Sequence, residues 1–407
     1  MPTIVRSHTG KCKLEFDFSM ELEADFQLQL RSDGYIGISV SSPLTATTAR
    51  IMKEHLERRL IWCSLTGTLT GPAGKITIKK LVLNGTNPHG NTQSSSITLD
   101  LMCAGNAEIE YSEISQQTVE VHFGLTNFDF MGCEYTTELN TIRADKFRAG
   151  LEGMEVIFKQ INNHQNIISE LAINHDVALT AEAITTISIA DLPQLEGLVD
   201  DVILLLSFAT GTVMSWIYQD VYLNDKLIKS VLHSTVTGPF VDRNWVIDPR
   251  NLEDCDLRIF LETCYPAFKT LKSDLGLNVV LDFLVVAEQG KYSEVKFLLD
   301  SVAAECLLSY LPSYFRKIGK TGNLKSFKSK MKELLNQFGI VFSESELDFI
   351  KTRDKIVHTG KFPVGVDPIE ATRMLHNLMD RITLTIFGYR GRFYVNHANR
   401  YNREALP

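Results

Sequence analysis

Residues 349–363, FIKTRDKIVHTGKFP, have the pattern of an amphipathic helix that ends at Gly360 and is closed by Pro363. With about 100° per residue, Arg353 falls about 40° from Phe349. That position lies inside the predicted apolar stripe, whose other members are Phe349, Ile350, Ile356 and Val357. Because arginine keeps its charge, a buried arginine needs a carboxylate, a group of carbonyls or a phosphate beside it.

A structural ion pair is one answer to this requirement. Glu305 lies at the edge of the apolar face of an earlier predicted helix and could neutralise Arg353 within the core. His358 falls about 140° from Arg353, so a straight helix does not bring the two side chains together. In this interpretation His358 is a last-turn histidine that is favoured by the helix dipole.

Four capped amphipathic helices are predicted in the last part of the chain. The first includes SEVKFLLDSVAAECLLSYL (293–311), and the second, FKSKMKELLNQFG (327–339), ends at Gly339. Ser343 and Glu346 form a capping box that opens the third helix. The fourth starts at Asp367, with Pro368 and Glu370 as its N1 and N3 residues. Short links between such helices predict a bundle over 281–407.

The third helix also carries a resemblance to a known family. RDKIVHTG, residues 353–360, resembles the R-x4-6-H motif of HEPN domains. The preceding AAECL with Glu305, the helix that ends in LLNQFGI and the later LMDRITLTIFGYRGRFY follow in the order of the ApeA-like subgroup, which is associated with bacterial antiphage defence. The resemblance covers residues 285–400. The motif continues with Thr359 and Gly360, so the tyrosine of the branch that is silenced by nucleotidylation is absent.

The resemblance implies a fold and an activity. The C-terminal bundle would form a homodimer that brings two copies of the motif together, and the chain would be a metal-independent endoribonuclease that needs no cofactor and acts in abortive infection. His358 would be the general acid or base, Arg353 would hold the phosphate, and Asp354 would orient the pair. Attack of a ribose 2′-OH on its phosphate would leave a 2′,3′-cyclic phosphate end.

A run of basic residues precedes the motif. Between residues 316 and 332 there are seven basic residues and no acidic one, although the chain has a formal net charge of -8. We expect RNA binding by Arg316, Lys317, Lys325, Lys328 and Lys332. A solvated helix face is the equally weighted alternative, because charge runs usually have that role.

The earlier parts of the chain predict a β-rich domain over 1–140 and a mainly helical region over 141–280. Alternating residues predict the strands, the cluster 83–93 predicts a turn, and residues 46–60 predict a helix. Later helices are expected over 147–171, 192–211 and 257–275, with two strands within 221–238. The uncharged run 202–218 indicates a buried core helix rather than a membrane span, because it is short and flanked by aspartates.

Composition limits the remaining possibilities. A chain of 407 residues with 44% hydrophobic and 22% charged residues predicts a soluble, cytoplasmic α+β protein of two or three domains, without a signal peptide. Seven scattered cysteines without a CxxC pair predict reduced, mostly buried thiols and no zinc site. We interpret His122, His175 and His376 as structural or surface groups without ligand-like neighbours, and Trp62, Trp216 and Trp245 as core anchors.

Three functions remain open from the sequence. The first is the HEPN-type endoribonuclease, in which the N-terminal domain would sense a phage-derived trigger. The second is a non-catalytic HEPN module for dimerisation and for binding RNA or protein, with Arg353 paired to Glu305. The third is a carbohydrate- or peptide-binding protein in which the N-terminal sheet holds the ligand.

Overall fold

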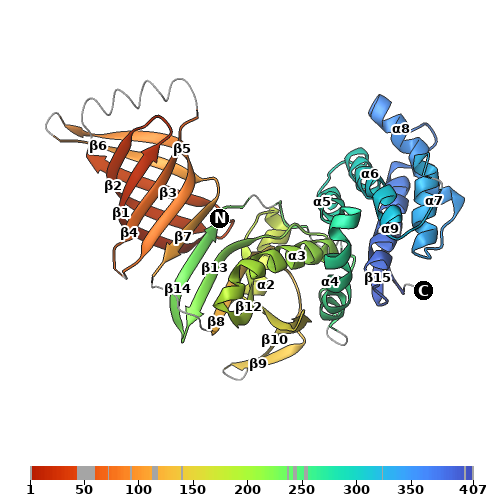
Figure 1. Cartoon of the computed structure of the whole chain (residues 1–407), viewed down its shortest axis with the longest axis horizontal. Coiled ribbons are helices and arrows are strands. Elements are labelled where there is room, and N and C mark those ends of the chain that lie inside the picture. Colours follow the sequence, from red (N-terminus) through yellow and green to blue (C-terminus); the bar gives the residue numbers. More distant parts are fainter. Residues whose placement is uncertain are drawn as a thin grey trace.

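The computed structural model describes residues 2–43, 60–71, 73–91, 94–111, 118–138, 141–235, 238–241, 245–251, 255–322, 324–397 and 400–405. The helix predicted over 46–60 lies almost entirely outside these residues. Within them, the molecule is a mixed α+β protein that begins with a β-rich region and ends with a helical region. Figure 1 shows the first strands at one end, the last helices at the other, and a twisted sheet between them.

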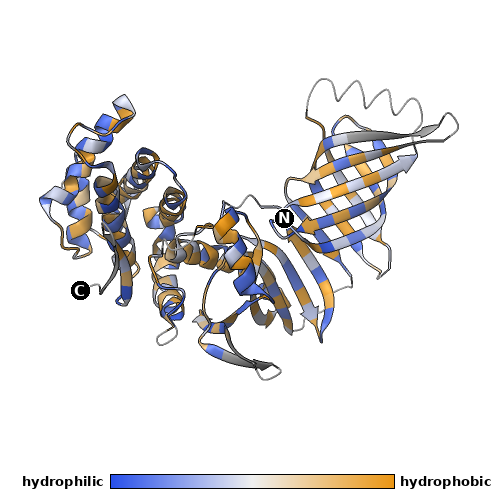
Figure 2. Ribbon diagram, turned by 180° about the vertical axis from the view of Figure 1, so that it is seen from behind, coloured by the Kyte–Doolittle hydropathy of each residue, from blue (hydrophilic) through white to orange (hydrophobic). Residues whose placement is uncertain are grey.

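A six-stranded barrel forms the N-terminal end. Its strands follow the order β4-β1-β2-β3-β6-β5, and the pairing of β4 with β5 closes it. Leu14, Leu28, Ile38, Leu65 and Leu99 are buried, as alternate residues on the inner face of a strand are. Hydrophobic and hydrophilic residues alternate along these strands (Figure 2). The strands are β1 (Ile4–Phe16), β2 (Glu21–Arg31), β3 (Ile36–Pro43), β4 (Trp62–Leu69), β5 (Lys75–Asn91) and β6 (Ser94–Cys103).

The turn predicted at residues 83–93 is wrong for most of its length, because β5 continues to Asn91. The ladder between β4 and β5 ends at the pair Trp62 and Val82, whereas β6 pairs with β5 as far as Asn91. Pro88 therefore lies where β5 has one neighbour among the described strands, and a strand edge tolerates the missing N–H of proline.

The sheet continues from the barrel without a break and includes strands from both sides of residue 140. After β5 the order is β7-β14-β13-β8-β12-β11-β10-β9. These strands are β7 (Asn106–Glu110), β8 (Thr118–Thr126), β9 (Glu134–Glu138), β10 (Thr141–Leu151), β11 (Met154–Gln160), β12 (Leu179–Ser188), β13 (Trp216–Leu223) and β14 (Lys226–His233). The two strands predicted within 221–238 are confirmed in part, as the end of β13 and β14.

The helix predicted over 147–171 is wrong in its first half. Residues 141–160 form the hairpin of β10 and β11, and only α2 (His164–Asn174) is helical. Glu152 and Gly153 have φ angles of 53° and 81°. Two consecutive residues with positive φ form the tight turn that joins twisted antiparallel strands, and they break a helix.

Two long helices cover one face of this sheet. α3 (Leu192–Thr210) follows the short helix η1 (Ile189–Asp191), and α4 (Asp256–Leu275) packs against both α3 and β10. The predicted single core helix over 202–218 is only partly right, because α3 ends at Gly211, whose φ is 65°, and Trp216 begins β13. Within the described residues, no helix combines the length and apolar character needed to cross a membrane.

The helical region follows the predicted order closely. Its elements are α5 (Leu277–Glu288), α6 (Ser293–Lys317), α7 (Phe327–Gln337), η2 (Glu344–Asp348), α8 (Phe349–Thr359) and α9 (Pro368–Ile386). α6 is central and packs against α5, α7, α8 and α9. The hairpin of β15 (Arg392–His397) and β16 (Arg400–Ala405) returns the chain to the middle of the molecule, where Tyr394 N donates to Val246 O over 2.8 Å.

The seven cysteines are not joined in disulfides, and five are buried and two half-buried, which confirms the prediction that they are mostly buried. Burial raises the pKa of Cys12 and Cys63 to about 12. Trp62 is 41% exposed, so its interpretation as a core anchor is wrong, whereas Trp216 is buried.

Candidate functional site at the end of helix α8

Helix α8 buries a narrower stripe than its sequence predicts. Its buried residues are Phe349, Thr352 and Ile356, whereas Val357 is 58% exposed. The predicted stripe is therefore rotated, and Arg353 lies at its margin with its side chain 25% exposed. A helix that packs mainly against one neighbour buries one line of contact, and here that neighbour is α6.

The guanidinium of Arg353 lies between two carboxylates. Nη2 donates to Oε1 of Glu305 on α6, and Nη1 donates to Oδ1 of Asp354 over 2.9 Å. Its Cζ atom is 5.9 Å from the ring centre of Phe327 at the start of α7. Glu305 is 37% exposed, so this ion pair lies at the rim of the helical region and not in its interior.

His358 is on the last turn of α8 and is exposed. Neither a hydrogen bond nor an ion pair joins it to any residue in the described part of the chain. Asp354 directs its carboxylate at Arg353. The structure thus brings Arg353, Asp354 and Glu305 together and leaves His358 apart from them within one chain.

The exposure of this pair sets the expected cost of breaking it. Ion pairs that reach solvent contribute about 0.2–1 kcal/mol. We therefore expect Arg353→Ala to lower the free energy of unfolding by about 1 kcal/mol or less, rather than the roughly 3–5 kcal/mol of a buried pair. A double-mutant cycle with Glu305→Gln, measured by urea denaturation, gives the coupling energy.

The pair of Arg373 with Glu370, which is 3.1 Å long and of similar exposure, is the matched control for that cycle. A coupling energy above about 3 kcal/mol between Arg353 and Glu305 would contradict the exposed geometry, because values of that size are typical of buried ion pairs.

The basic run is partly neutralised in the structure. Lys317, at the end of α6, pairs with Asp274 over 2.5 Å. On α7, Lys328 pairs with Glu344 over 2.9 Å, and Lys332 contacts the same carboxylate. Hydrogen bonds from Lys332 and Lys328 lower the pKa of Glu344. Arg316 is exposed at the end of α6, and Lys325 is exposed just before α7.

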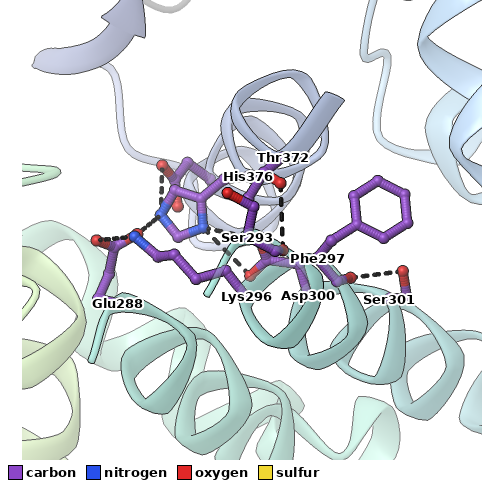
Figure 3. Close-up of polar contacts among 9 residues, drawn as sticks. Glu288, Ser293, Lys296, Phe297, Asp300, Ser301, Thr372 and His376 are labelled. Atoms are coloured by element: carbon purple, nitrogen blue, oxygen red, sulfur yellow. Dashed lines mark hydrogen bonds and ion pairs between the residues drawn. The ribbon is translucent and has the colours of Figure 1, made fainter. Parts of the chain in front are cut away.

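A buried charge cluster joins α5, α6 and α9 (Figure 3). His376 of α9 lies at its centre, with Nε2 2.8 Å from Oε1 of Glu288 and Nδ1 3.2 Å from Oδ1 of Asp300. Nε2 is also 3.6 Å from Oδ2 of Asp380, and Lys296 Nζ is 3.1 Å from Oε2 of Glu288. The side chain of His376 is 12% exposed and that of Asp300 is fully buried, so the cluster holds helices together and leaves little room for a substrate.

Burial and neighbouring charges shift the pKa values of these groups in opposite directions. Burial disfavours the imidazolium of His376, but Asp380, Glu288 and Asp300 outweigh it and raise its pKa well above 6.5. Burial raises the pKa of Asp380 to about 7 despite His376. For Glu288 burial is overcome by His376 and Lys296, which lower its pKa to about 2. Burial also raises the pKa of Asp300. The cluster therefore contains an imidazolium, an ionised Glu288 and two carboxyl groups whose pKa values burial raises.

The prediction that His376 lacks ligand-like neighbours is wrong. The sequence held a partial signal, because His376 and Asp380 are four residues apart on one helix, as are Lys296 and Asp300. His122 also has neighbours, with Nε2 2.7 Å from Glu120 and Nδ1 3.9 Å from Glu182. The ring of His175 lies 3.4 Å from Phe240 O at the end of α2. Among the described residues, no group of three or more histidine, cysteine or acidic side chains has the arrangement of a metal site.

The comparisons with known proteins do not identify a family. Neither the protein-family models nor the curated protein sequences give a match to this chain.

Proposed function

We propose that this protein is a metal-independent endoribonuclease of the HEPN type that acts in antiphage defence. The observation that carries the proposal is the state of helix α8. It ends in an exposed imidazole, His358, and carries a guanidinium, Arg353, that is held in place and still reaches solvent. Figure 1 shows α8 at the outer end of the helical region.

The proposed reaction needs no group beyond these side chains. His358 takes the proton of a ribose 2′-OH, O2′ forms a bond with the adjacent phosphorus, and the bond from phosphorus to O5′ breaks. His358, now an imidazolium, gives this proton to the leaving O5′, and a 2′,3′-cyclic phosphate remains. A guanidinium has five N–H donors, so Arg353 can bind phosphate oxygens with donors that Glu305 and Asp354 do not use.

In a homodimer, an Arg353 and a His358 side chain would lie close together, which they do not within one chain. Arg353 and His358 are about 140° apart around the helix axis, so the two groups of one chain face different directions. A second copy related by a two-fold axis would bring its own Arg353 and His358 to the same cleft. The exposed Val357 within the motif is an apolar group that such a contact would cover.

A binding module without catalysis is the second candidate. It is favoured by the carboxylates of Glu305 and Asp354, which already bind the guanidinium that a phosphate would need. In this case the helical region would dimerise and bind RNA or a protein. Cleavage of RNA in the presence of EDTA separates the two functions, because only the proposed ribonuclease cleaves under that condition.

RNA binding by the basic run is testable through its salt dependence. Replacing Lys325, Lys328 and Lys332 by glutamate should weaken RNA binding. The slope of log Kd against log salt concentration should fall by about 0.7 for each phosphate that a lysine no longer neutralises. Fluorescence anisotropy with a labelled single-stranded RNA at several salt concentrations measures both effects.

Glu344→Gln is the matched control, because it removes the carboxylate that pairs with Lys328 and Lys332 and should strengthen RNA binding. If neither variant changes the affinity or the slope, the basic run is a solvated face and does not bind RNA.

The proposal also includes where the ribonuclease acts and what activates it. The chain would act in the cytoplasm without a cofactor, and its β-rich region would sense a phage-derived trigger that releases the ribonuclease.

A further inference from the structure

A large cavity lies in the middle of the molecule, far along the chain from α8. Its volume is about 780 Å³, and it is lined by β10, the end of β11, the first turns of α2, Met131 and Arg250. Small-molecule sites commonly have volumes of about 300–1,000 Å³. We call it the amide cavity, because Asn162, Asn163, Gln165 and Asn166 all line it.

The four amide side chains are exposed, and none of them hydrogen-bonds to a residue that the structure describes. Asn163 is at the N-cap position of α2, where asparagine usually caps the first turn. Here it has a left-handed conformation with φ 63°, and its side chain makes no capping hydrogen bond. The amides therefore remain available to a ligand, to which each can both donate and accept hydrogen bonds.

The same cavity has a place for an anion. No side chain caps α2, and its first turn has no acidic residue, so no negative charge there offsets the helix dipole. The amides of His164 and Asn166 donate to Ile161 O and Asn163 O, so the amide of Gln165 is the N–H group of this turn that is left for an anion. Lys159 is exposed beside it and forms no ion pair within the described residues. One carboxylate, Asp145, also lines the cavity.

Arg250 and His164 form more rigid parts of the lining. Nε of Arg250 donates to Asp129 over 3.0 Å, and its Cζ atom is 4.9 Å from the ring centre of Trp245, so its planar group is fixed. His164 is only 3% exposed, and its Nε2 lies 3.1 Å from Phe128 O. Since a carbonyl only accepts, Nε2 donates, and Nδ1 is a buried acceptor without a partner in the described part of the chain.

We propose that the amide cavity binds a small nucleotide. Its phosphate would lie at the start of α2 with Lys159, and amide side chains would recognise the donor and acceptor edge of the base, as asparagine and glutamine do for adenine. A fixed guanidinium such as Arg250 offers a plane on which a base can stack. This inference does not rest on the ribonuclease proposal, because it uses no residue of α8.

Isothermal titration calorimetry of the full-length protein with AMP, GMP, CMP and UMP tests the inference. At least one 5′-mononucleotide should bind with a Kd below about 1 mM, which corresponds to about 4 kcal/mol. Its nucleoside and inorganic phosphate should each bind at least about tenfold more weakly, because each lacks one of the two recognised parts. His358→Ala should bind the nucleotide as the native protein does.

Two variants locate the site. Lys159→Ala should weaken binding about tenfold through the loss of a charge-assisted hydrogen bond. The double change Gln165→Ala and Asn166→Ala should have a similar effect, and alanine is well tolerated in a helix. Lys291→Ala and Asn336→Ala, which change exposed residues elsewhere, are the matched controls and should bind normally.

Several results would overturn the proposal. They are no binding of any mononucleotide, binding of inorganic phosphate as tight as that of the nucleotide, and binding that the Lys159 and amide variants leave unchanged. Binding of a single-stranded oligoribonucleotide without binding of any mononucleotide would also reject it, because it would identify an RNA surface instead.

Discussion

His358→Ala should lower the rate of RNA cleavage by about a hundredfold or more, which is the usual contribution of one general acid–base group. The protein should keep its stability to within about 0.5 kcal/mol, because the side chain is exposed. The measurement is the single-turnover cleavage rate of a labelled RNA in EDTA, together with urea denaturation and the mass in solution. In cells, phage protection or toxicity should disappear with the cleavage.

Lys355→Ala is the control for this experiment, since Lys355 is another exposed residue of α8. It should retain cleavage within a few fold. Arg353→Ala should also lose activity, but it disturbs the contacts with Glu305 and Asp354, so His358 is the sharper test. Full cleavage by a folded His358→Ala protein of unchanged mass would contradict the proposed mechanism. The non-catalytic binding module would then be the remaining candidate function.

Local signals explain why the C-terminal helices could be predicted from sequence. Asp367 caps α9 by accepting hydrogen bonds from Ile369 N and Glu370 N, and Gly360 ends α8 with φ 69°. The capping box of Ser343 and Glu346 is also present, although it opens the short helix η2 immediately before α8. Each of these features involves residues only two to four positions apart, so a pattern in the sequence contains all of it.

The hairpin of β10 and β11 shows a different kind of error. Residues 147–151 alternate between buried and exposed side chains, with Phe147, Ala149 and Leu151 buried. That period of two was present in the sequence, but glutamate, lysine and leucine nearby also favour a helix. Pairing with β12 through Val156 and Phe158 decides in favour of a strand, and such a partner about 30 residues away is not visible locally.

The sequence predicts the positions of the helices better than the geometry of the sites. Helix periodicity placed Arg353 and Glu305 each at the apolar face of its own helix, and the structure pairs the two side chains. In contrast, the amide cavity combines Met131, Asp145, His164 and Arg250 from separate segments. The partners of His376 come from three helices, and only Asp380 is on its own helix. Contacts of this kind depend on how the helices pack, which no spacing along the chain records.

A large loss of stability is expected when His376 is removed from the buried charge cluster. His376→Ala removes the only imidazolium in contact with Glu288, Asp300 and Asp380 among the described residues and leaves these carboxylates buried. Removing one partner from a buried ionic group costs about 3–5 kcal/mol. We therefore expect a loss of this size in the free energy of unfolding at pH 7, measured by urea denaturation. A loss below about 1 kcal/mol would mean that water reaches the cluster.

Asp380→Asn is the control, and its effect should have the opposite sign above neutral pH. In the native protein the pKa of Asp380 is raised from 3.8 to about 7, and Oδ1 has no partner in the described part of the chain. A raised pKa contributes stability that is complete below pH 3.8 and is lost as the pH rises to about 7. The raised pKa of His376 adds a loss in the same direction at higher pH.

The native protein should therefore lose stability between pH 5 and pH 8, with about 3 kcal/mol of the loss from Asp380, because the rest of its shift of about 4 kcal/mol is already lost below pH 5. An asparagine does not ionise, so Asp380→Asn should remove the part of this decline that Asp380 causes and be the more stable protein at pH 8. The parts that Asp300 and His376 cause should remain. Denaturation curves of both proteins at pH 5, 6.5 and 8 measure the difference. Parallel curves for the two proteins would show that Asp380 does not titrate in this range, and the charge state assigned to the cluster would then be wrong.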